Sequence, residues 1–369
     1  MTADLPALLQ SKPHPMISKN DATAQAPWRR QCDLGLAAPH RMAWHLGGNP
    51  EGDPWLLLHG GPGSGANAGL LAPLDLSRHR AIAPDQRGSG ASRPRGSTLR
   101  NHTAALVSDL ESLRRHLGLE RWSLLAGSWG TVLALAYAQA HPQRVQRLVL
   151  RGAFALSRRE IGDLLQGRAS GKTLSAPRAF WPVSRGVALS ALLARLRQLL
   201  QTGTPAVAAL RAARRWALLE SRAAARGQWR ALLGVEGAEA AGLRAVWAGQ
   251  RRRERRLSAG FRHRGDRIDP TDRALLRKFR IQSHYLLRRG FVRPGGLDCA
   301  VRAVALAGVP VDWVHGAFDA VCPPQNSRRW QAQMARLAPG RSSLTLTRAG
   351  HLGHEPRTLA ALREKVRRS

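Results

Sequence analysis

A serine lies between small residues in Ala126-Gly127-Ser128-Trp129-Gly130, at the junction of an apolar run and an Ala- and Leu-rich run. Small flanking residues let the backbone turn sharply from a strand into a helix and expose the serine hydroxyl. A hydroxyl is a weak nucleophile, so it needs a base that a third group orients. The segment predicts Ser128 as the nucleophile of an acyl-transfer reaction.

Two polar residues near the C-terminus follow the serine in the order that such a nucleophile requires. Asp319 follows the apolar run 309–314, and His351 follows the run 343–347. On a sheet with this kind of nucleophile turn, the acid and then the histidine come after the serine along the chain. We therefore predict Asp319 as the orienting acid and His351 as the base. His354 is the competing histidine, but it lies further into the following helical segment.

A glycine-rich segment, HGGPG at 59–63, directly follows the apolar run 55–58. Glycines there allow a backbone N–H group to approach a developing oxyanion. We predict the N–H groups of Gly61 and Trp129 as the two oxyanion donors. The alternative interpretation is an ordinary glycine-rich turn.

Alternating short apolar runs and amphipathic stretches organise both halves of the chain. The segment 103–117 places leucines at spacings of three and four residues, which predicts a helix with one buried stripe. Strands that alternate with helices favour an α/β fold with a mostly parallel sheet and helices on both faces. The predicted strands are 55–58, 80–83, 122–125, 148–150, 309–314 and 343–347.

The middle of the chain differs from this pattern. Residues 156–291 are helical in pattern and hold 27 Arg and 2 Lys against 9 acidic residues. We predict a helical, Arg-rich cap at 156–291 over an α/β core at 28–155 and 292–369, with a flexible arm at 1–27. A cap inserted there would cover a site at the C-terminal ends of the strands.

The composition restricts the class of protein and its partners. The chain has 58 Lys and Arg against 24 Asp and Glu, but its apolar fraction of 43% excludes a disordered polyelectrolyte. The basic run 251–256 indicates a polyanion partner as one alternative, although only Trp229 and Trp247 supply aromatic rings nearby. The basic residues are scattered along the chain, so we favour a compositional bias and expect neither nucleic acid as the primary partner nor a membrane.

Three cysteines, Cys32, Cys299 and Cys322, lack the C-x-x-C spacing of a structural zinc site. An odd, small number also argues against a disulfide framework, so we expect a reducing, cytoplasmic compartment. Neither a secretory signal in 1–27 nor an unbroken apolar run of membrane-spanning length is evident. The predicted chemistry requires no metal and no organic cofactor.

Several strings together give the chain a resemblance to the proline iminopeptidases (prolyl aminopeptidases) of the α/β-hydrolase superfamily. The resemblance implies the α/β-hydrolase fold and the release of N-terminal proline, or a similar small residue, from short peptides. It also implies Ser128, Asp319 and His351 as the catalytic triad. The matching strings are HGGPG at 59–63, DQRGSG at 85–90, GSWG at 127–130, LVLRG at 148–152, VHG at 314–316, Asp319 with Cys322-Pro323, and Gly350-His351.

The resemblance further implies two acidic residues that bind the substrate's amino end. One aligns with Glu220, whose neighbours three and four positions away are alanine and tryptophan, so its own helix supplies no basic partner. The second position holds Gln282, whose amide can accept a hydrogen bond but carries no charge. Charge-assisted hydrogen bonds are about twice as strong as neutral ones, so we expect weaker binding of an amine.

The apolar pocket for the proline ring departs from the family as well. Phe154 keeps an aromatic residue and Cys322 a small wall, whereas Leu165 and Leu286 stand where relatives carry aromatic rings. These departures leave open an alternative function, that of an esterase or amide hydrolase with altered acyl specificity.

Overall fold

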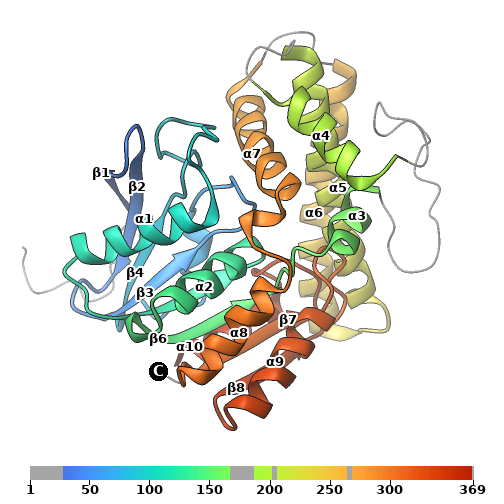
Figure 1. Ribbon diagram of the computed structural model, residues 1–369. Helices are drawn as coiled ribbons and strands as arrows, with labels where there is room; N and C mark the ends of the chain where they lie inside the picture. The colour runs from blue at the N-terminus through green and yellow to red at the C-terminus, as the bar shows by residue number, and fades with distance from the viewer. Residues whose placement is uncertain (1–27, 167–186, 202–205, 264–267, 368–369) are drawn as a thin grey trace, which may run out of the picture.

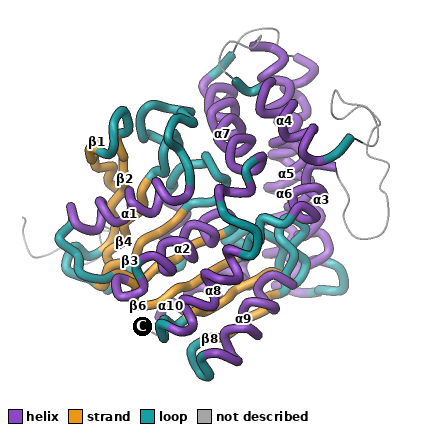
Figure 2. Tube along the Cα trace, viewed as in Figure 1, coloured by secondary structure: helices purple, strands orange, loops and turns teal. Residues whose placement is uncertain are grey.

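The structure is a computed structural model that describes residues 28–166, 187–201, 206–263 and 268–367. The arm at 1–27 lies outside the described residues. Eight strands form one sheet in the order β1-β2-β4-β3-β5-β6-β7-β8, which Figure 2 shows in orange. Strands β3 to β8 run parallel to one another, and β2 is antiparallel to both β1 and β4. The strands are β1 Arg29–Gly35, β2 Arg41–Gly48, β3 Asp53–Leu58, β4 His79–Pro84, β5 Trp122–Gly127, β6 Val145–Arg151, β7 Val311–Gly316 and β8 Ser342–Thr347.

Both faces of the sheet are covered, and the side chains of β3 show how. Leu56 and Leu58 belong to one apolar cluster, whereas Trp55 and Leu57 belong to a second. Alternate residues of a strand point to opposite faces, so a strand covered on both sides is apolar throughout. Helices α1, α2, α8 and α9 pack on the first face (Figure 1), and α10 packs on the second. Their bounds are α1 Thr103–His116, α2 Trp129–Ala140, α8 Gly296–Leu306, α9 Gln325–Leu337 and α10 Pro356–Arg367.

Five helices between β6 and β7 form what we call the helical layer, which Figure 1 shows gathered apart from the helices on the sheet. Helix α5 contacts both α6 and α7. A buried ion pair joins α5 to α7, because two of the Arg214 guanidinium nitrogens, Nε and Nη2, donate to Asp272 at 3.0 and 2.6 Å. The layer comprises α3 Arg158–Gln166, α4 Leu189–Leu199, α5 Ala206–Leu232, α6 Gly237–His263 and α7 Pro270–Leu287. The 3₁₀ turns within the described residues are Ala68–Leu71, Pro142–Arg144 and Arg289–Phe291.

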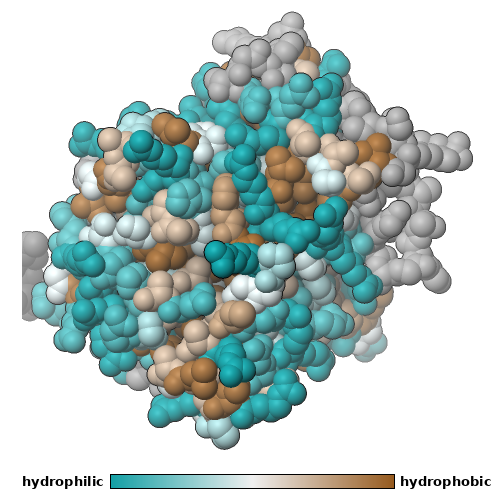
Figure 3. All heavy atoms as spheres, viewed as in Figure 1, coloured by the Kyte–Doolittle hydropathy of each residue, from teal (hydrophilic) through white to brown (hydrophobic). Residues whose placement is uncertain are grey.

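The basic run 251–256 lies on α6. Within it Arg251 pairs with Glu254, and the rings of Trp229 and Trp247 contact each other with centroids 5.1 Å apart. Hydrophilic residues cover most of the face in Figure 3, and apolar residues form separate patches on it. Among the helices of the described residues, none has the length and apolar character needed to cross a membrane.

All six predicted strands are present. Five of them include the predicted residues and differ from the predictions by a few residues at most, whereas the strand predicted at 309–314 is shifted to Val311–Gly316. The parallel sheet with helices on both faces is confirmed. The antiparallel pair β1 and β2 was missed. The sequence of β1, RRQCDLG, mixes charged and apolar residues without a regular alternation, and β2 ends in two glycines, so neither has the apolar periodicity that predicts a strand.

Candidate active site

Ser128 lies at the turn between β5 and α2 with a backbone conformation that is unusual for a non-glycine residue. Its φ is 55° and its ψ is −125°. The turn is held in place because the Ser128 N–H donates to the carbonyl of Arg151 at 2.9 Å, and the Ser128 carbonyl accepts the N–H of Thr131 at 2.9 Å. Strained backbone of this kind persists where the surroundings over-determine it, and it concentrates at active sites. The strand-turn-helix context expected of a nucleophile is therefore present.

Close packing explains the small residues on either side of the serine. A Cβ atom at Gly127 would lie 2.2 Å from the Arg151 guanidinium, and one at Gly130 would lie 2.5 Å from the Leu58 carbonyl oxygen. Neither position can accept a side chain without displacing its neighbour. Ala126, two residues before the serine, lies fully within the core.

His351 and Asp319 come together after β8 and β7. His351 Nδ1 lies 2.7 Å from Asp319 Oδ2, and the other carboxylate oxygen accepts the N–H groups of Val321 and Cys322 at 2.8 and 2.9 Å. His315 Nε2 is 3.4 Å from Oδ2 on its other side. Burial by itself would raise the pKa of Asp319, but the charge of and hydrogen bonds from His351 and His315 hold that pKa well below its usual value. The carboxylate is thus ionised and oriented toward the imidazole.

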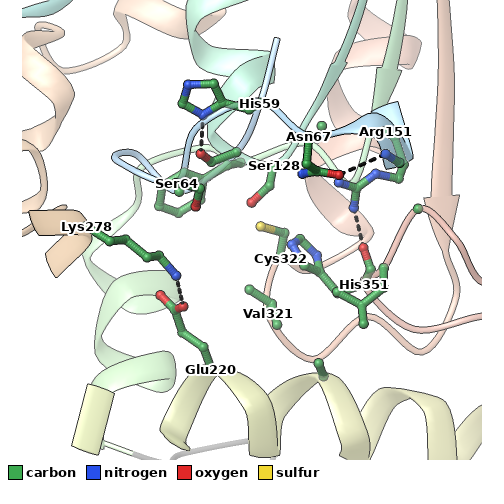
Figure 4. A pocket seen from close by; sticks show the side chains of 18 of the residues that line it. His59, Ser64, Asn67, Ser128, Arg151, Glu220, Lys278, Val321, Cys322 and His351 are labelled. Atoms are coloured by element: carbon green, nitrogen blue, oxygen red, sulfur yellow. Dashed lines mark hydrogen bonds and ion pairs between the residues drawn. The ribbon is translucent and has the colours of Figure 1, made fainter. Parts of the chain in front are cut away.

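Ser128 and His351 line one cavity of about 660 Å³, shown in Figure 4. Asp319 lies behind His351 and is 7% exposed, and His354 also borders the cavity. Burial, together with the positive charge of Arg151, lowers the pKa of His354. Unlike His351, His354 makes no carboxylate contact among the described residues, so His351 is the histidine that a carboxylate orients.

The glycine loop lies directly against the serine. A Cβ atom at Gly60 would be 3.5 Å from Ser128 Cβ, and Gly61 has a φ of 118°, which an L side chain rarely adopts. Trp129 is the first residue of α2, and N–H groups in the first turn of a helix have no intrahelical acceptor. Gln86 ties the two segments together, since it accepts the Trp129 indole N–H at 2.9 Å and donates to the His59 carbonyl at 3.1 Å.

The predicted walls of the acyl pocket are mostly where they were expected. Phe154, Leu286 and Cys322 line the cavity. Leu165 is buried in the core, and its neighbour Leu164 lines the cavity instead. The Cys322 thiol is buried at the cavity wall, and burial raises its pKa well above the usual range. Cys322 therefore remains a neutral thiol beside the serine.

Glu220 and Gln282 meet in the cavity, but Glu220 has a partner that the sequence did not reveal. Gln282 Nε2 donates to Glu220 Oε1 at 2.6 Å, and Lys278 Nζ donates to Oε2 at 2.5 Å. The basic partner comes from α7 rather than from the helix of Glu220, so inspection of α5 alone could not find it. In the described part of the chain, no group of three or more His, Cys, Asp and Glu side chains could hold a metal ion.

Comparison with known proteins assigns the family. Residues 53–358 match the family described as alpha/beta hydrolase fold. A proline iminopeptidase of Xylella fastidiosa is 34% identical over 332 residues, covering 88% of this chain and 91% of the relative. One from Xanthomonas citri is 32% identical over 345 residues, covering 90% and 94%. The chain belongs to the proline iminopeptidase family of α/β hydrolases. Among solved structures, an α/β hydrolase from a Medee basin deep-sea metagenome library has a TM-score of 0.55 at 14% identity, covering 89% of this chain and 95% of its own.

A Rhodococcus esterase has a TM-score of 0.52 at 21% identity, covering 92% of this chain and 98% of its own. These structures share the fold of this proline iminopeptidase family member.

Three residues near the site carried no prediction: Arg151, His315 and Lys278. Arg151 donates to the His351 carbonyl and His315 contacts Asp319. His315 stands in the matching string VHG and Arg151 in the matching string LVLRG, which could have indicated a role for each, whereas Lys278 is an ordinary basic residue among 58.

Proposed function

We propose that this α/β hydrolase is a serine aminopeptidase that releases an N-terminal proline, or a similar small residue, from short peptides through an acyl-enzyme. The observation that carries the proposal is that His351, paired with the buried Asp319, lines the same cavity as a serine on a strained turn. The names of the most similar relatives supply the substrate class. The cavity size suits a small acyl group and the start of a peptide.

In the proposed mechanism, Ser128 Oγ attacks the scissile carbonyl carbon while His351 Nε2 takes the hydroxyl proton. Asp319 holds Nδ1–H, fixing the tautomer in which Nε2 can accept a proton, and it stabilises the imidazolium that forms. The N–H groups of Gly61 and Trp129 donate to the oxyanion of the tetrahedral intermediate. His351 then protonates the leaving amine, and the peptide departs one residue shorter.

Deacylation repeats the steps with water. His351 removes a proton from the water molecule as it attacks the acyl carbon, and it returns that proton to Ser128 as the bond to the serine oxygen breaks. Glu220, with Gln282 beside it, lies in the same cavity and would bind the amino end of the acyl group. The chemistry uses only side chains and backbone groups of the chain.

The proposal is tested with prolyl and alanyl p-nitroanilides and p-nitrophenyl acetate, using Ser128→Ala as the control. We expect hydrolysis of the prolyl anilide above that of the alanyl anilide, and loss of all three activities in the variant. Labelling by a fluorophosphonate should modify Ser128. Hydrolysis of the acetate ester without either anilide would contradict the aminopeptidase.

A second candidate, an esterase or amide hydrolase with altered acyl specificity, is favoured by one observation. The amine-binding position combines a carboxylate, a lysine and a neutral amide, where the family resemblance implies two carboxylates. Neutral acyl esters that are hydrolysed faster than any aminoacyl substrate would support this candidate over the first.

A further inference from the structure

The carboxylate expected to bind the substrate's amino group is already bound on both oxygens. Lys278 and Gln282 are four positions apart on α7, so their side chains share one helix face. Lys278 Nζ lies 2.5 Å from Glu220 Oε2, and Gln282 Nε2 lies 2.6 Å from Oε1. Figure 4 shows the Lys278 and Glu220 side chains pointing toward each other inside the cavity.

The ion pair is well supported by its surroundings. The side chains of Lys278 and Glu220 are only 19% and 22% exposed. The Lys278 ammonium also lies 4.6 Å from the centroid of the Phe279 ring, within range of a cation–π interaction. Partial burial strengthens an ion pair relative to one on the open surface, because solvent screens it less.

The other charges around the cavity do not replace Glu220. Apart from histidines, the charged residues that line it in the described part of the chain are Arg151, Arg253, Lys278, Glu160 and Glu220. Glu160 already accepts hydrogen bonds from main-chain N–H groups, and burial raises its pKa to about 7. Of the two carboxylates that line the cavity among the described residues, Glu220 is thus the one left to an incoming ammonium, and Lys278 is the lining cation that contacts it.

Gln282 offers a different kind of contact. Its Oε1 is buried and has no hydrogen-bond partner within the described structure, while its Nε2 faces Glu220. Because the residue lines the cavity, this oxygen can accept a hydrogen bond from a ligand N–H without supplying charge. The site combines a free neutral acceptor with a carboxylate whose charge is compensated.

From this geometry we propose that Lys278 is a specificity-determining residue that occupies the cation site of Glu220. A prolyl ammonium must compete with the lysine for the carboxylate, whereas a neutral five-membered acyl group meets no such competition. The acyl pocket therefore binds cationic and neutral acyl groups of the same ring shape with similar affinity. The inference rests on the proposed function, because it places the acyl group in this cavity.

The test measures binding, so that it does not depend on turnover. In a Ser128→Ala background, calorimetry compares L-prolinamide, at a pH where its amine is protonated, with cyclopentanecarboxamide, a neutral ligand of the same shape. Lys278→Met should tighten prolinamide binding roughly tenfold relative to the neutral amide, the difference between a charge-assisted and a neutral hydrogen bond. Lys278→Gln, which keeps a hydrogen-bond donor, should show the same change if the methionine variant does not fold.

Arg277→Met is the matched control, because it removes one positive charge from the adjacent position on α7 and Arg277 does not line the cavity. It should leave the ratio of the two affinities unchanged. An unchanged ratio in both Lys278 variants, an equal change in the control, or no prolinamide binding after Lys278 is replaced would overturn the inference. The proposed function fails separately if the unmodified enzyme cleaves no aminoacyl anilide.

Discussion

Replacement of Asp319 by asparagine tests the proposed triad at its most constrained point. Four nitrogen atoms contact the two carboxylate oxygens of Asp319. The N–H groups of Val321 and Cys322 donate to Oδ1, and His351 Nδ1 and His315 Nε2 lie next to Oδ2. Asparagine has one acceptor oxygen and one NH₂ donor. If its oxygen keeps the two main-chain N–H groups, its NH₂ group must face the imidazole.

The amide donor then selects the imidazole tautomer in which Nδ1 accepts and Nε2 carries the hydrogen. That tautomer cannot take the proton of Ser128, so kcat for the prolyl anilide should fall roughly 10⁴-fold. A 10⁴-fold loss corresponds to about 5.5 kcal/mol of transition-state stabilisation. KM should change little, because Asp319 does not line the cavity. The assay is steady-state hydrolysis of the prolyl anilide, accompanied by the free energy of unfolding of each variant.

Asp312→Asn provides the matched control on β7, the strand that precedes Asp319. Asp312 bonds Arg147 at 2.5 Å and lies away from the cavity lining, so its replacement should lower stability while kcat stays unchanged. A folded Asp319→Asn variant whose kcat remains within tenfold of the original would refute the assignment of Asp319. Equal losses of kcat in both variants would show that the effect comes from destabilisation alone.

Three further predictions concern charge. Gln282→Glu should lower KM for prolyl substrates roughly tenfold and leave acetate ester turnover unchanged, since a charged acceptor replaces a neutral one beside Glu220; an unchanged KM would contradict this. Hydrogen bonds from Arg114, aided by Tyr137, lower the pKa of Glu111 from 4.5 to about 2. The ionised Glu111 therefore stabilises the folded state fully at pH values above its unfolded pKa, and this stabilisation is lost as the pH falls toward 2. Glu111→Gln should therefore cost about 3 kcal/mol in chemical unfolding at pH 7 and less than half of that at pH 3; a pH-independent difference would refute it. Prolyl peptides with Asp or Glu downstream of the proline should show higher kcat/KM at low salt than those with Lys or Arg, and the difference should shrink as the salt concentration rises. Equal rates at low salt would indicate that the excess of basic residues is only a compositional bias.

The nucleophile turn could be predicted because its chemistry restricts nearby residues in the sequence. Gly127 and Gly130 are small for steric reasons that act within a few residues of Ser128, and the strands before and after are apolar because both sheet faces are buried. The positions of Asp319 and His351 followed from the order of the strands, since the ends of parallel strands meet at one edge.

Contacts between distant segments could not be predicted in the same way. Arg151 reaches the His351 carbonyl across 200 positions in the sequence. His315 lies only four positions before Asp319, but their contact depends on how the loop after β7 folds back. Neither contact leaves a local periodicity. Lys278 and Glu220 are 58 positions apart, and their pairing depends on how α5 and α7 pack, which residue type alone does not indicate.

The basic composition of the helical layer and the altered amine site have a common physical basis. Three acidic side chains in the layer have basic partners: Asp272 pairs with Arg214, Glu254 with Arg251, and Glu220 with Lys278. Where basic side chains greatly outnumber carboxylates, a carboxylate readily finds a basic partner within the protein. Such a pair forms without the loss of translational freedom that binding a ligand costs, so the internal ion pair is favoured over the one with a ligand. A carboxylate selects an ammonium only to the extent that the ligand outcompetes that partner. Acyl specificity at this site therefore depends on the strength of the Lys278–Glu220 pair as much as on the presence of the acidic residue.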